Sequence, residues 1–453
     1  MNIVILGAGE IGRHIASHLS EKRHEIRVIE SDEELAGQVE QHLDGKVICG
    51  DGSLASVLLE ASVGRAELFL ACTSCNNTNL VSCAIAKELG AMKTICRVHP
   101  SVEKDELMLN RRELFNIDHL FSSERLAVIE LAKTIRNPES LVVEEMAQGK
   151  IELQQVEVSH HSKTAGQNLR DLALPDHFRV AYISRAAEHL VPGPDDRIQP
   201  GDVVTIVGNP RDVRSFAHEI RKGIGRPRET SVVILGGGQY GAELARVLQA
   251  GSNRIRIFEK DQARCEDLKK AFGREATIIH ADATDLSSLK EEQVGDASFF
   301  VATLADDADN VMACLQASDL GAAHTLTLLH RADYAAAIQH FSDHSPQVGI
   351  DRAVSPREAA LSHLLRFVTS DSHHVLRTLD TAELIEANVA EGSSIAGKQV
   401  SEISWPHGSV LVGHIHGLHA EVPNAETVLE PGNNILAMVS TEAKKKFVKL
   451  LSK

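Results

Sequence analysis

The chain has 453 residues and a formal net charge of −16, because 63 Asp and Glu residues outnumber 47 Lys and Arg residues. This balance argues against non-specific nucleic-acid binding and against a polybasic membrane anchor, since both require a basic surface. No stretch approaches the roughly 20 apolar residues of a spanning helix, and the N-terminus has no signal-peptide character. The seven scattered cysteines favour reduced thiols. Composition therefore predicts a soluble, acidic, cytosolic protein of several domains.

The first part of the chain alternates short apolar runs with amphipathic helices. Strands are predicted at residues 2–6, 26–30, 46–49, 67–72, 94–98 and 118–121. In the first helix, Ile11, Ile15 and Leu19 recur at the spacing of one helical face. This alternation is typical of βαβ units and predicts a Rossmann-like α/β domain with a doubly wound parallel sheet.

A helix is predicted next, over residues 123–135, and the segment from about 141 to 220 alternates apolar and polar residues. The alternation predicts a small α+β domain rich in strands. The same series of elements then starts again, with a second helix over 356–368 and a second β-rich segment over 375–453.

The chain is an internal duplication of a unit of about 225 residues. The clearest match is between IVILGAGEIGRHIASHL (3–19) and VVILGGGQYGAELARVL (232–248), at a spacing of 229 residues. Further pairs are ELFLACT (67–73) with SFFVAT (298–303), IDHLFSSERLA (117–127) with IDRAVSPREAA (350–360), and VPGPDDRIQPGDVVTIVG (191–208) with VPNAETVLEPGNNILAMV (422–439). Two Rossmann-like domains, each followed by a small α+β domain, are the predicted architecture.

The domain boundaries follow from these segments and from a basic stretch that contains Gly and Pro. The predicted parts are the first Rossmann-like domain (1–122), a helical crossover (123–140), the first small domain (141–222), a linker (223–230), the second Rossmann-like domain (231–355), a second helical crossover (356–374) and the second small domain (375–453).

Both copies carry a G-x-G-x-x-G motif, GAGEIG at 7–12 and GGGQYG at 236–241. Each motif directly follows an apolar strand and opens an amphipathic helix, and an acid, Glu30 or Glu259, lies 23 residues past its first glycine. This context predicts dinucleotide binding, with the pyrophosphate at the helix N-terminus. A carboxylate at the ribose favours NAD over NADP.

The three glycines have separate predicted roles. The first allows the tight turn, the second allows the backbone to approach the pyrophosphate, and the third lets the helix pack on the strand. The alternative is that a loop keeps its glycines for packing and binds nothing. That alternative weighs more for the second copy, in which Ala242 replaces Arg13 and Leu328 replaces Arg97.

Other polar residues follow the third and fourth strands, where they would face the same crevice. These are Asp51 and Thr73 in the first copy and Asp282 and Thr303 in the second. They are candidate adenosine or ribose contacts, and simple turn residues are the alternative.

Two further patterns are weaker. Cys72 and Cys75 form a C-x-x-C, but no second pair completes a zinc site, and Ala302 and Ala305 occupy the places matched to them in the second copy. His414, His416 and His419 gather on a probable strand and turn, where solvent-facing histidines are the simpler interpretation. We predict neither a metal site nor catalytic residues.

An oxidoreductase requires a substrate domain that brings an acid–base residue to the nicotinamide. Here a small β-rich domain follows each Rossmann-like domain, and the sequence contains no nucleophile elbow, P-loop lysine or H-E-x-x-H. These features favour a non-enzymatic sensor. An NAD-dependent dehydrogenase and a scaffold that binds no nucleotide remain the alternatives.

The duplicated motifs resemble the regulator-of-potassium-conductance (RCK, or KTN) family. The resemblance extends over essentially the whole chain. The tandem N–C–N–C order of domains is similar to the order in the cytosolic nucleotide-binding subunits of bacterial Trk potassium uptake systems. The resemblance implies a homo-oligomer, most simply a tetramer, that is peripheral on the cytoplasmic face of the inner membrane. The implied partner is an integral-membrane potassium transporter subunit of the TrkH or TrkG type, reached through protein contacts only.

The resemblance also implies ligands, namely NAD⁺ or NADH and, at the same sites, ATP or ADP. Family binding positions fall on Gly7, Ala8, Gly9, Glu10, Ile11, Gly12, Arg13, Glu30, Asp51, Thr73 and Arg97, and in the second copy on Gly236, Gly237, Gly238, Gln239, Tyr240, Gly241, Glu259, Asp282 and Thr303. We expect Arg13 or Arg97 to detect the γ-phosphate of ATP, and ligands to act by shifting the population between two states of the assembly.

Overall fold

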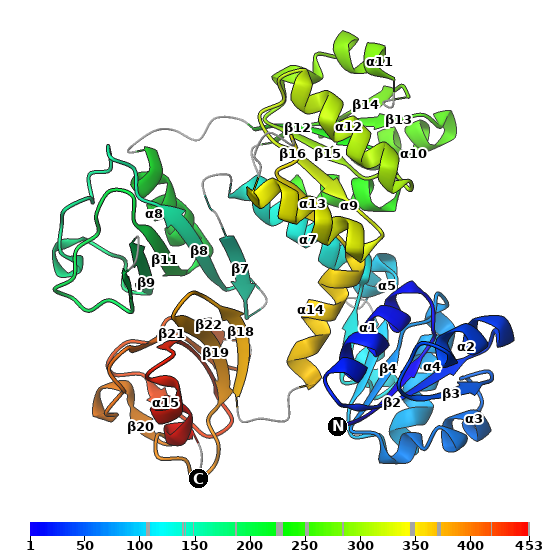
Figure 1. Ribbon diagram of the computed structural model, residues 1–453, viewed down its shortest axis with the longest axis horizontal. Helices are drawn as coiled ribbons and strands as arrows, with labels where there is room; N and C mark the ends of the chain where they lie inside the picture. Colours follow the sequence, from blue (N-terminus) through cyan, green and yellow to red (C-terminus); the bar gives the residue numbers. More distant parts are fainter. Residues whose placement is uncertain are drawn as a thin grey trace. The chain divides into compact units, whose positions relative to one another are not determined.

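The computed structural model describes residues 1–105, 109–137, 140, 142–147, 149–185, 188–222, 230–249, 253–282, 285–344, 349–368, 373–417 and 419–451. The chain divides into two compact units, Met1–Ala132 with Glu229–Val368, and Lys133–Arg228 with Thr369–Lys453. The first unit holds both α/β domains and the second holds both small domains (Figure 1). All of the expected linker at 223–230 except Thr230 lies outside the described residues.

The first α/β domain contains all six predicted strands, with ends within one residue of those expected. They are β1 (Asn2–Leu6), β2 (Glu25–Glu30), β3 (Lys46–Cys49), β4 (Leu68–Ala71), β5 (Thr94–Arg97) and β6 (His119–Phe121). The helices are α1 (Glu10–Glu21), α2 (Glu33–Glu40), α3 (Ala55–Glu60), α4 (Asn76–Glu88), α5 (Pro100–Asp105), α6 (Arg111–Leu114) and α7 (Ser123–Arg136). The strands are parallel in the order β3-β2-β1-β4-β5-β6, which confirms the doubly wound fold.

The second α/β domain repeats this topology in the order β14-β13-β12-β15-β16-β17. Its strands are β12 (Thr230–Leu235), β13 (Asn253–Glu259), β14 (Ala276–His280), β15 (Phe299–Ala302), β16 (Thr325–Leu328) and β17 (Arg352–Val354). Its helices are α9 (Gln239–Leu248), α10 (Gln262–Phe272), α11 (Leu286–Glu291), α12 (Asp307–Asp319), α13 (Ala332–His344) and α14 (Pro356–Val368).

The helix α14 packs against the first α/β domain, although it follows the second domain in sequence (Figure 1). Its apolar residues Ala360, Leu361 and Leu364 belong to the core formed by Ile11 and Ile15 of α1. The opposite face of the first sheet is covered by α3 and α4. The two α/β domains therefore share a core within their unit, which the repeat alone did not predict.

The two small domains are rich in strands, as the alternation predicts, and each consists of an antiparallel sheet that is followed by a helix. The first contains β7 (Val142–Met146), β8 (Ile151–Glu157), β9 (Phe178–Arg185), β10 (Glu188–Leu190), β11 (Val203–Gly208) and α8 (Pro210–Lys222). The second contains β18 (His373–Thr378), β19 (Ala382–Asn388), β20 (Lys398–Gln399), β21 (Ser409–His416), β22 (His419–Glu421), β23 (Val428–Leu429), β24 (Asn434–Ser440) and α15 (Lys444–Leu451). Strand β18 thus begins two residues before the expected start of the second small domain.

The two small domains pack on each other within their unit. Buried Leu153 and Tyr182 of the first share a core with Leu384 and Met438 of the second. The Tyr182 hydroxyl also lies 2.9 Å from the Thr381 hydroxyl. Both pairs of like domains are therefore joined through buried side chains.

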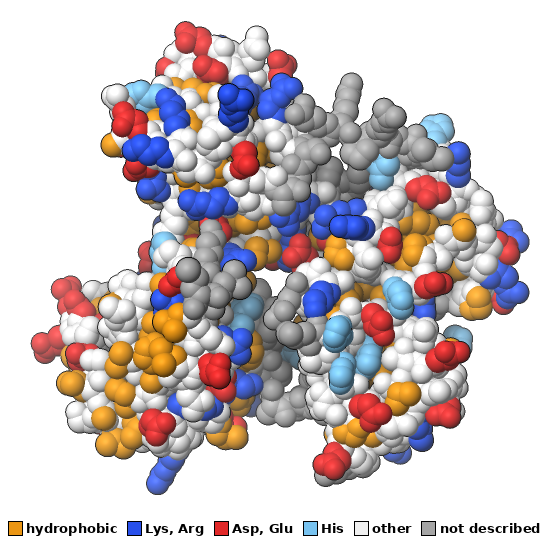
Figure 2. All heavy atoms as spheres, turned by 180° about the vertical axis from the view of Figure 1, so that it is seen from behind, with side chains coloured by type: hydrophobic (Ala, Val, Ile, Leu, Met, Phe, Trp, Pro, Cys, Tyr) orange, Lys and Arg blue, Asp and Glu red, His pale blue; other side chains and the backbone are white. Residues whose placement is uncertain are grey.

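Acidic and basic side chains are interspersed on the face shown in Figure 2. Among the described residues, no helix combines the length and apolar character required to cross a bilayer.

Candidate functional site

The first glycine loop connects β1 to α1 and has the backbone that the motif requires. Gly7 has a φ of +96°, a conformation that favours glycine. A Cβ on Gly12 would lie 2.0 Å from the Gly7 carbonyl oxygen, whereas a Cβ on Gly9 would meet nothing within 4 Å. Gly9 is also the N-cap of α1 and makes no side-chain cap. The loop therefore presents open space and uncapped backbone N–H groups at a helix N-terminus.

The second glycine loop has almost the same geometry. Gly236 has a φ of +92°, and a Cβ on Gly241 would lie 1.9 Å from the Gly236 carbonyl oxygen. Gly238, the N-cap of α9, again has nothing within 4 Å of its Cβ position. The first and third glycines are thus required by packing in both copies, and the second faces open space in both.

The acid after each second strand holds its glycine loop through backbone amides. The buried Glu30 carboxylate accepts hydrogen bonds from the N–H groups of Ala8 at 2.6 Å and Ser31 at 2.7 Å. Glu259 accepts hydrogen bonds from Gly237 at 3.0 Å and Asp261 at 2.9 Å. Both carboxylates therefore fix the loop backbone beside the crevice.

The first glycine loop borders a hollow of about 400 Å³ at the carboxyl ends of the strands, where doubly wound sheets bind ligands. Predicted residues that line it are Gly7, Gly9, Glu10, Ile11, Glu30, Thr73, Arg97 and Tyr240. Ser31, Leu35, Cys72, Ser74, His330, Pro356 and Arg357 also line it and were not predicted. Tyr240, His330, Pro356 and Arg357 come from the second α/β domain.

The packing of α14 on α1 explains how the second domain reaches this hollow. The helix α14 begins at Pro356, and its first turn lies beside the start of α1. The Arg357 guanidinium is 2.8 Å from the Glu10 carboxylate, and His14 is 3.0 Å from Glu358. The ring of Tyr240 contacts the ring of His330 edge-on, with centroids 5.8 Å apart.

Both arginines of the hollow are paired with carboxylates. Arg97 lies 2.8 Å from Glu124, whose side chain is only 12% exposed. Burial opposes ionisation of Glu124, but Arg97 and nearby hydrogen bonds outweigh it and hold the pKa of this carboxyl below its ordinary value. Burial, with the charge of Glu124, raises the pKa of Tyr240, so its hydroxyl stays protonated.

Other predicted residues of the first copy lie apart from the hollow. Arg13 is exposed on α1 and is not among the lining residues. Asp51 accepts hydrogen bonds from the Ser53 N–H at 2.8 Å and the Ser53 hydroxyl at 2.7 Å, as a turn residue does. The corresponding Asp282 is exposed.

The sequence match of Thr73 with Thr303 was wrong by one residue. Leu6 pairs with Ala71 and Leu235 pairs with Ala302, so Thr303 is the counterpart of Cys72, and Leu304 is the counterpart of Thr73. The Thr303 hydroxyl is buried and donates to the Leu235 carbonyl oxygen at 2.8 Å. The hydroxyl at this crevice position is therefore specific to the first copy.

Two buried asparagines organise the carboxyl ends of the strands, and sequence reasoning missed both. The Asn79 amide nitrogen donates to the carbonyl oxygens of Thr73 at 3.0 Å and Arg97 at 2.9 Å. Asn310 donates to Leu304 and Leu328 at 2.9 Å each. The recurrence of Asn at the matching place in α4 and α12 was the signal that could have found them.

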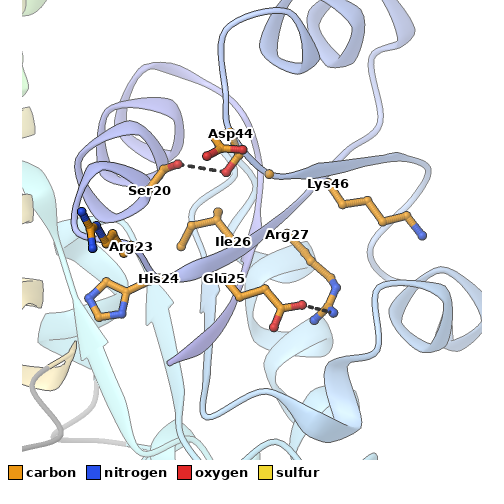
Figure 3. Close-up of a pocket in the computed structure, with 9 residues that line it drawn as sticks. Ser20, Arg23, His24, Glu25, Ile26, Arg27, Asp44 and Lys46 are labelled. Carbon is orange, nitrogen blue, oxygen red and sulfur yellow. Dashed lines mark hydrogen bonds and ion pairs between the residues drawn. The ribbon is translucent and has the colours of Figure 1, made fainter.

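The larger hollow in Figure 3, of about 570 Å³, lies at the opposite edge of the first sheet. It is lined by the starts of β2 and β3, and there Arg27 pairs with Glu25 at 2.5 Å. Because ligands of doubly wound sheets bind at the carboxyl ends of the strands, this hollow is not the predicted site.

The cysteine and histidine patterns do not assemble a metal site among the described residues. Burial raises the pKa of Cys72 to about 12, and Cys75 is exposed. Their counterparts are Thr303 and Asp306, and the expected matches to Ala302 and Ala305 were also one residue out of register. His414 lies 2.7 Å from Asn433, and His416 pairs with His419 in the β21–β22 hairpin.

Family models match both kinds of domain. A model described as the TrkA-N domain matches residues 3–122 and 232–356, and one described as the TrkA-C domain matches 153–221 and 384–452. The chain belongs to the TrkA family. The resemblance found from the duplicated motifs is thereby confirmed.

Relatives of the TrkA family match over nearly the whole chain. The chain is 29% identical over 461 residues to Trk system potassium uptake protein TrkA homolog 1 of Methanosarcina mazei, covering 99% of this chain and 100% of the relative. It is 30% identical over 452 residues to Trk system potassium uptake protein TrkA of Halomonas elongata, covering 97% and 96%.

Solved structures share the fold. The GsuK RCK domain matches with a TM-score of 0.60 at 17% identity, covering 99% of this chain and 94% of that chain. A structure described as GsuK channel bound to NAD matches with a TM-score of 0.61 at 17% identity, covering 99% and 78%.

Proposed function

We propose that this TrkA-family chain is the regulatory nucleotide-binding subunit of a Trk-type potassium uptake system and does not act as an enzyme. The observation that carries the proposal is the open first glycine loop, bordered by Glu30 and Arg97 at the carboxyl ends of a doubly wound sheet. The names of the whole-length relatives support the transport system.

The proposed ligands are NAD⁺ or NADH and, at the same loops, ATP or ADP. Phosphates would bind at the uncapped N-termini of α1 and α9, above Gly9 and Gly238. Glu30 would bind the ribose, and a ribose hydroxyl would replace the Ser31 hydroxyl, which is its longest contact at 3.2 Å. GsuK structures described as bound to NAD and to ADP support the same two ligand classes.

The other predicted residues remain proposed ligand contacts, and the structure supports some of them more strongly than others. Thr73 and Arg97 line the first hollow, whereas Arg13, Asp51 and Asp282 would reach a ligand only from its rim. In the second loop, Gly237, Gln239 and Glu259 would act as their counterparts do in the first. Thr303 has the least support, because its hydroxyl is already bonded to the main chain.

Regulation would work by differential affinity. A nucleotide changes the transporter only if it binds one state of the TrkA assembly more tightly than another. The two α/β domains share the core around α1 and α14, so a ligand at the first loop contacts both domains of the unit. We propose that their mutual arrangement is the element that the ligand biases.

The proposed partner is an integral-membrane potassium transporter subunit of the TrkH or TrkG type, bound through protein contacts at the cytoplasmic face of the inner membrane. The proposed assembly is a homotetramer. Large exposed apolar side chains support self-association: Leu59 is 60% exposed, Met312 54% and Phe341 55%. We also propose that the Rossmann-like domains span residues 1–122 and 231–355 and the small domains 141–222 and 375–453.

The test combines binding, turnover and reconstitution with the full chain. Thermal shift with NADH, ATP and ADP should show stabilisation without NADH consumption, and substitution of Gly9 should remove the effect of the first loop. The chain should also bind a Trk-type membrane subunit in detergent and change its potassium flux when nucleotide is added. Absence of every shift would support a scaffold, and NADH turnover with a metabolite would support a dehydrogenase.

A further inference from the structure

The first hollow is built from two domains, and its cationic lining is split between them. Arg97 comes from the end of β5, and Arg357 comes from the first turn of α14 in the second α/β domain. Arg97 is bound to the partly buried Glu124 within the structure. Arg357 is bound to Glu10, which is 64% exposed and is the first residue of α1. Of the two cations, Arg357 has the more exposed and more easily displaced partner.

Glu10 lies at the helix N-terminus, where a ligand phosphate would bind. It begins the helix whose N-terminal amides the glycine loop exposes, so its carboxylate competes for the same charges as a ligand phosphate. The Arg357 side chain is 18% exposed, and its Nε is buried without a hydrogen-bond partner among the described residues. A guanidinium has five donors in a planar fork that suits a phosphate, and Glu10 leaves part of this fork unused.

The counterpart of Arg357 has the opposite charge. The segment SSER at 122–125 matches SPRE at 355–358, so Glu124 occupies the place that Arg357 has in the second copy. The charge of Glu124 raises the pKa of Tyr240 in the second glycine loop, and the charge of its partner Arg97 opposes this shift. The first turn of α14 therefore carries a cation at the first loop, and the matching first turn of α7 carries an anion in its place.

We propose that Arg357 binds the terminal phosphate of a nucleoside polyphosphate held by the first glycine loop, and that Glu10 competes with that phosphate for the guanidinium. This inference rests on the proposed nucleotide-binding function of the first loop. A terminal phosphate carries up to two charges and three acceptor oxygens, whereas each phosphate inside a dinucleotide carries one charge. Arg357 therefore favours ATP and ADP over NAD at the first loop only.

The experiment is isothermal titration of the full chain with ATP, ADP and NAD⁺ at constant ionic strength, in a Gly238→Val background that blocks the second loop. Arg357→Gln is expected to weaken ATP binding roughly tenfold and NAD⁺ binding less than about twofold, because a charge-assisted hydrogen bond is lost. Glu10→Gln is expected to tighten ATP binding about threefold, because the competing carboxylate is removed.

The matched control is Arg27→Gln. The Arg27–Glu25 pair has side-chain exposures of 19% and 64%, close to the 18% and 64% of Arg357 and Glu10, but it lies at the opposite edge of the sheet (Figure 3). This variant should leave all three affinities unchanged. If Arg27→Gln weakens ATP as much as Arg357→Gln does, the effect is general electrostatics and the inference is wrong.

A second measurement tests the inference even if the Arg357→Gln variant does not fold. Hydrogen exchange of the wild-type chain should show that ATP, and NAD⁺ much less, slows exchange in the first turn of α14, and Arg357→Lys should weaken ATP binding by an intermediate factor. Unchanged exchange in α14, or an unchanged ratio of ATP to NAD⁺ affinity in the variants, would overturn the inference while nucleotide binding stands. A wild-type chain that binds no nucleotide would instead overturn the proposed function.

Discussion

The two glycine loops have nearly identical backbones but different charged residues at matching positions. Their first glycines have φ values of +96° and +92°. A Cβ on the third glycine would lie about equally close to the carbonyl oxygen of the first glycine in both loops, at 2.0 and 1.9 Å. Around the first loop lie Arg97 and Arg357. Around the second, Leu328 replaces Arg97, and Glu124 replaces Arg357.

This difference separates folding requirements from binding requirements. Glycines that prevent a backbone clash are retained in both copies, since the βα turn cannot form without them. Charged side chains above the loop are free to change, because they do not hold the turn together. Duplicated loops can therefore keep one fold while only one of them keeps a cationic site.

The largest expected effect tests what the copies share. Gly12→Ala and Gly241→Ala should each destabilise the α/β unit by about 3 kcal/mol, because the new Cβ would overlap a carbonyl oxygen. Denaturant unfolding measures both. Gly9→Ala and Gly238→Ala, which meet open space, are the controls and should leave stability nearly unchanged. Unequal losses for the third glycines would show that the loops are not structurally equivalent.

Substitution of the two buried asparagines tests whether the copies share a stabilising role but differ in ligand binding. Asn79→Ala and Asn310→Ala should each cost about 2–3 kcal/mol, because main-chain groups lose hydrogen bonds in a buried place. Only Asn79→Ala should also weaken nucleotide binding at the first loop, since Asn79 holds Thr73 and Arg97. Calorimetric titration of the two variants checks this. Equal loss of affinity in both would contradict the asymmetry of the sites.

The smallest expected effect concerns the Arg97–Glu124 pair, which has no counterpart beside Leu328. The pKa of Glu124 is below its ordinary value, so the pair stabilises the fold above the pKa of an unfolded glutamate, about 4.3. That stability is lost as the pH falls through the folded-state pKa. Glu124→Gln should cost about 1–2 kcal/mol at pH 7 and less at low pH.

Urea unfolding at pH 7 and at stepwise lower pH measures this dependence. Glu60→Gln, at an exposed glutamate of α3, is the control. A Glu124→Gln stability that falls with pH as steeply as the wild type would show that another carboxylate is responsible.

Most of the fold could be predicted because its signals are local. The strands of the first α/β domain were predicted within one residue of their observed ends, since each is a short apolar run between turn residues. The glycine loops were predicted from spacing, because a tight turn and a helix–strand contact require glycine wherever they occur.

An error arose in deciding which residues of the two copies correspond, because that depends on how their strands pair. Thr73 and Thr303 look alike in sequence, yet the sheet register places Leu304 at the position of Thr73. The copies keep one spacing of 231 residues before and after this turn, so the error came from matching the seven residues 67–73 with the six residues 298–303. Arg13, in the first turn of α1, is exposed and does not line the hollow, so its contact with a ligand stays a prediction.

The sequence by itself determined the duplication, the two α/β domains with their glycine loops, and the acids Glu30 and Glu259. These depend on periodicity and spacing within short segments. Only the tertiary structure decided that α14 packs on the first domain and brings Arg357 to Glu10. Such contacts join residues more than 300 positions apart, and they depend on which apolar face of a helix finds which sheet.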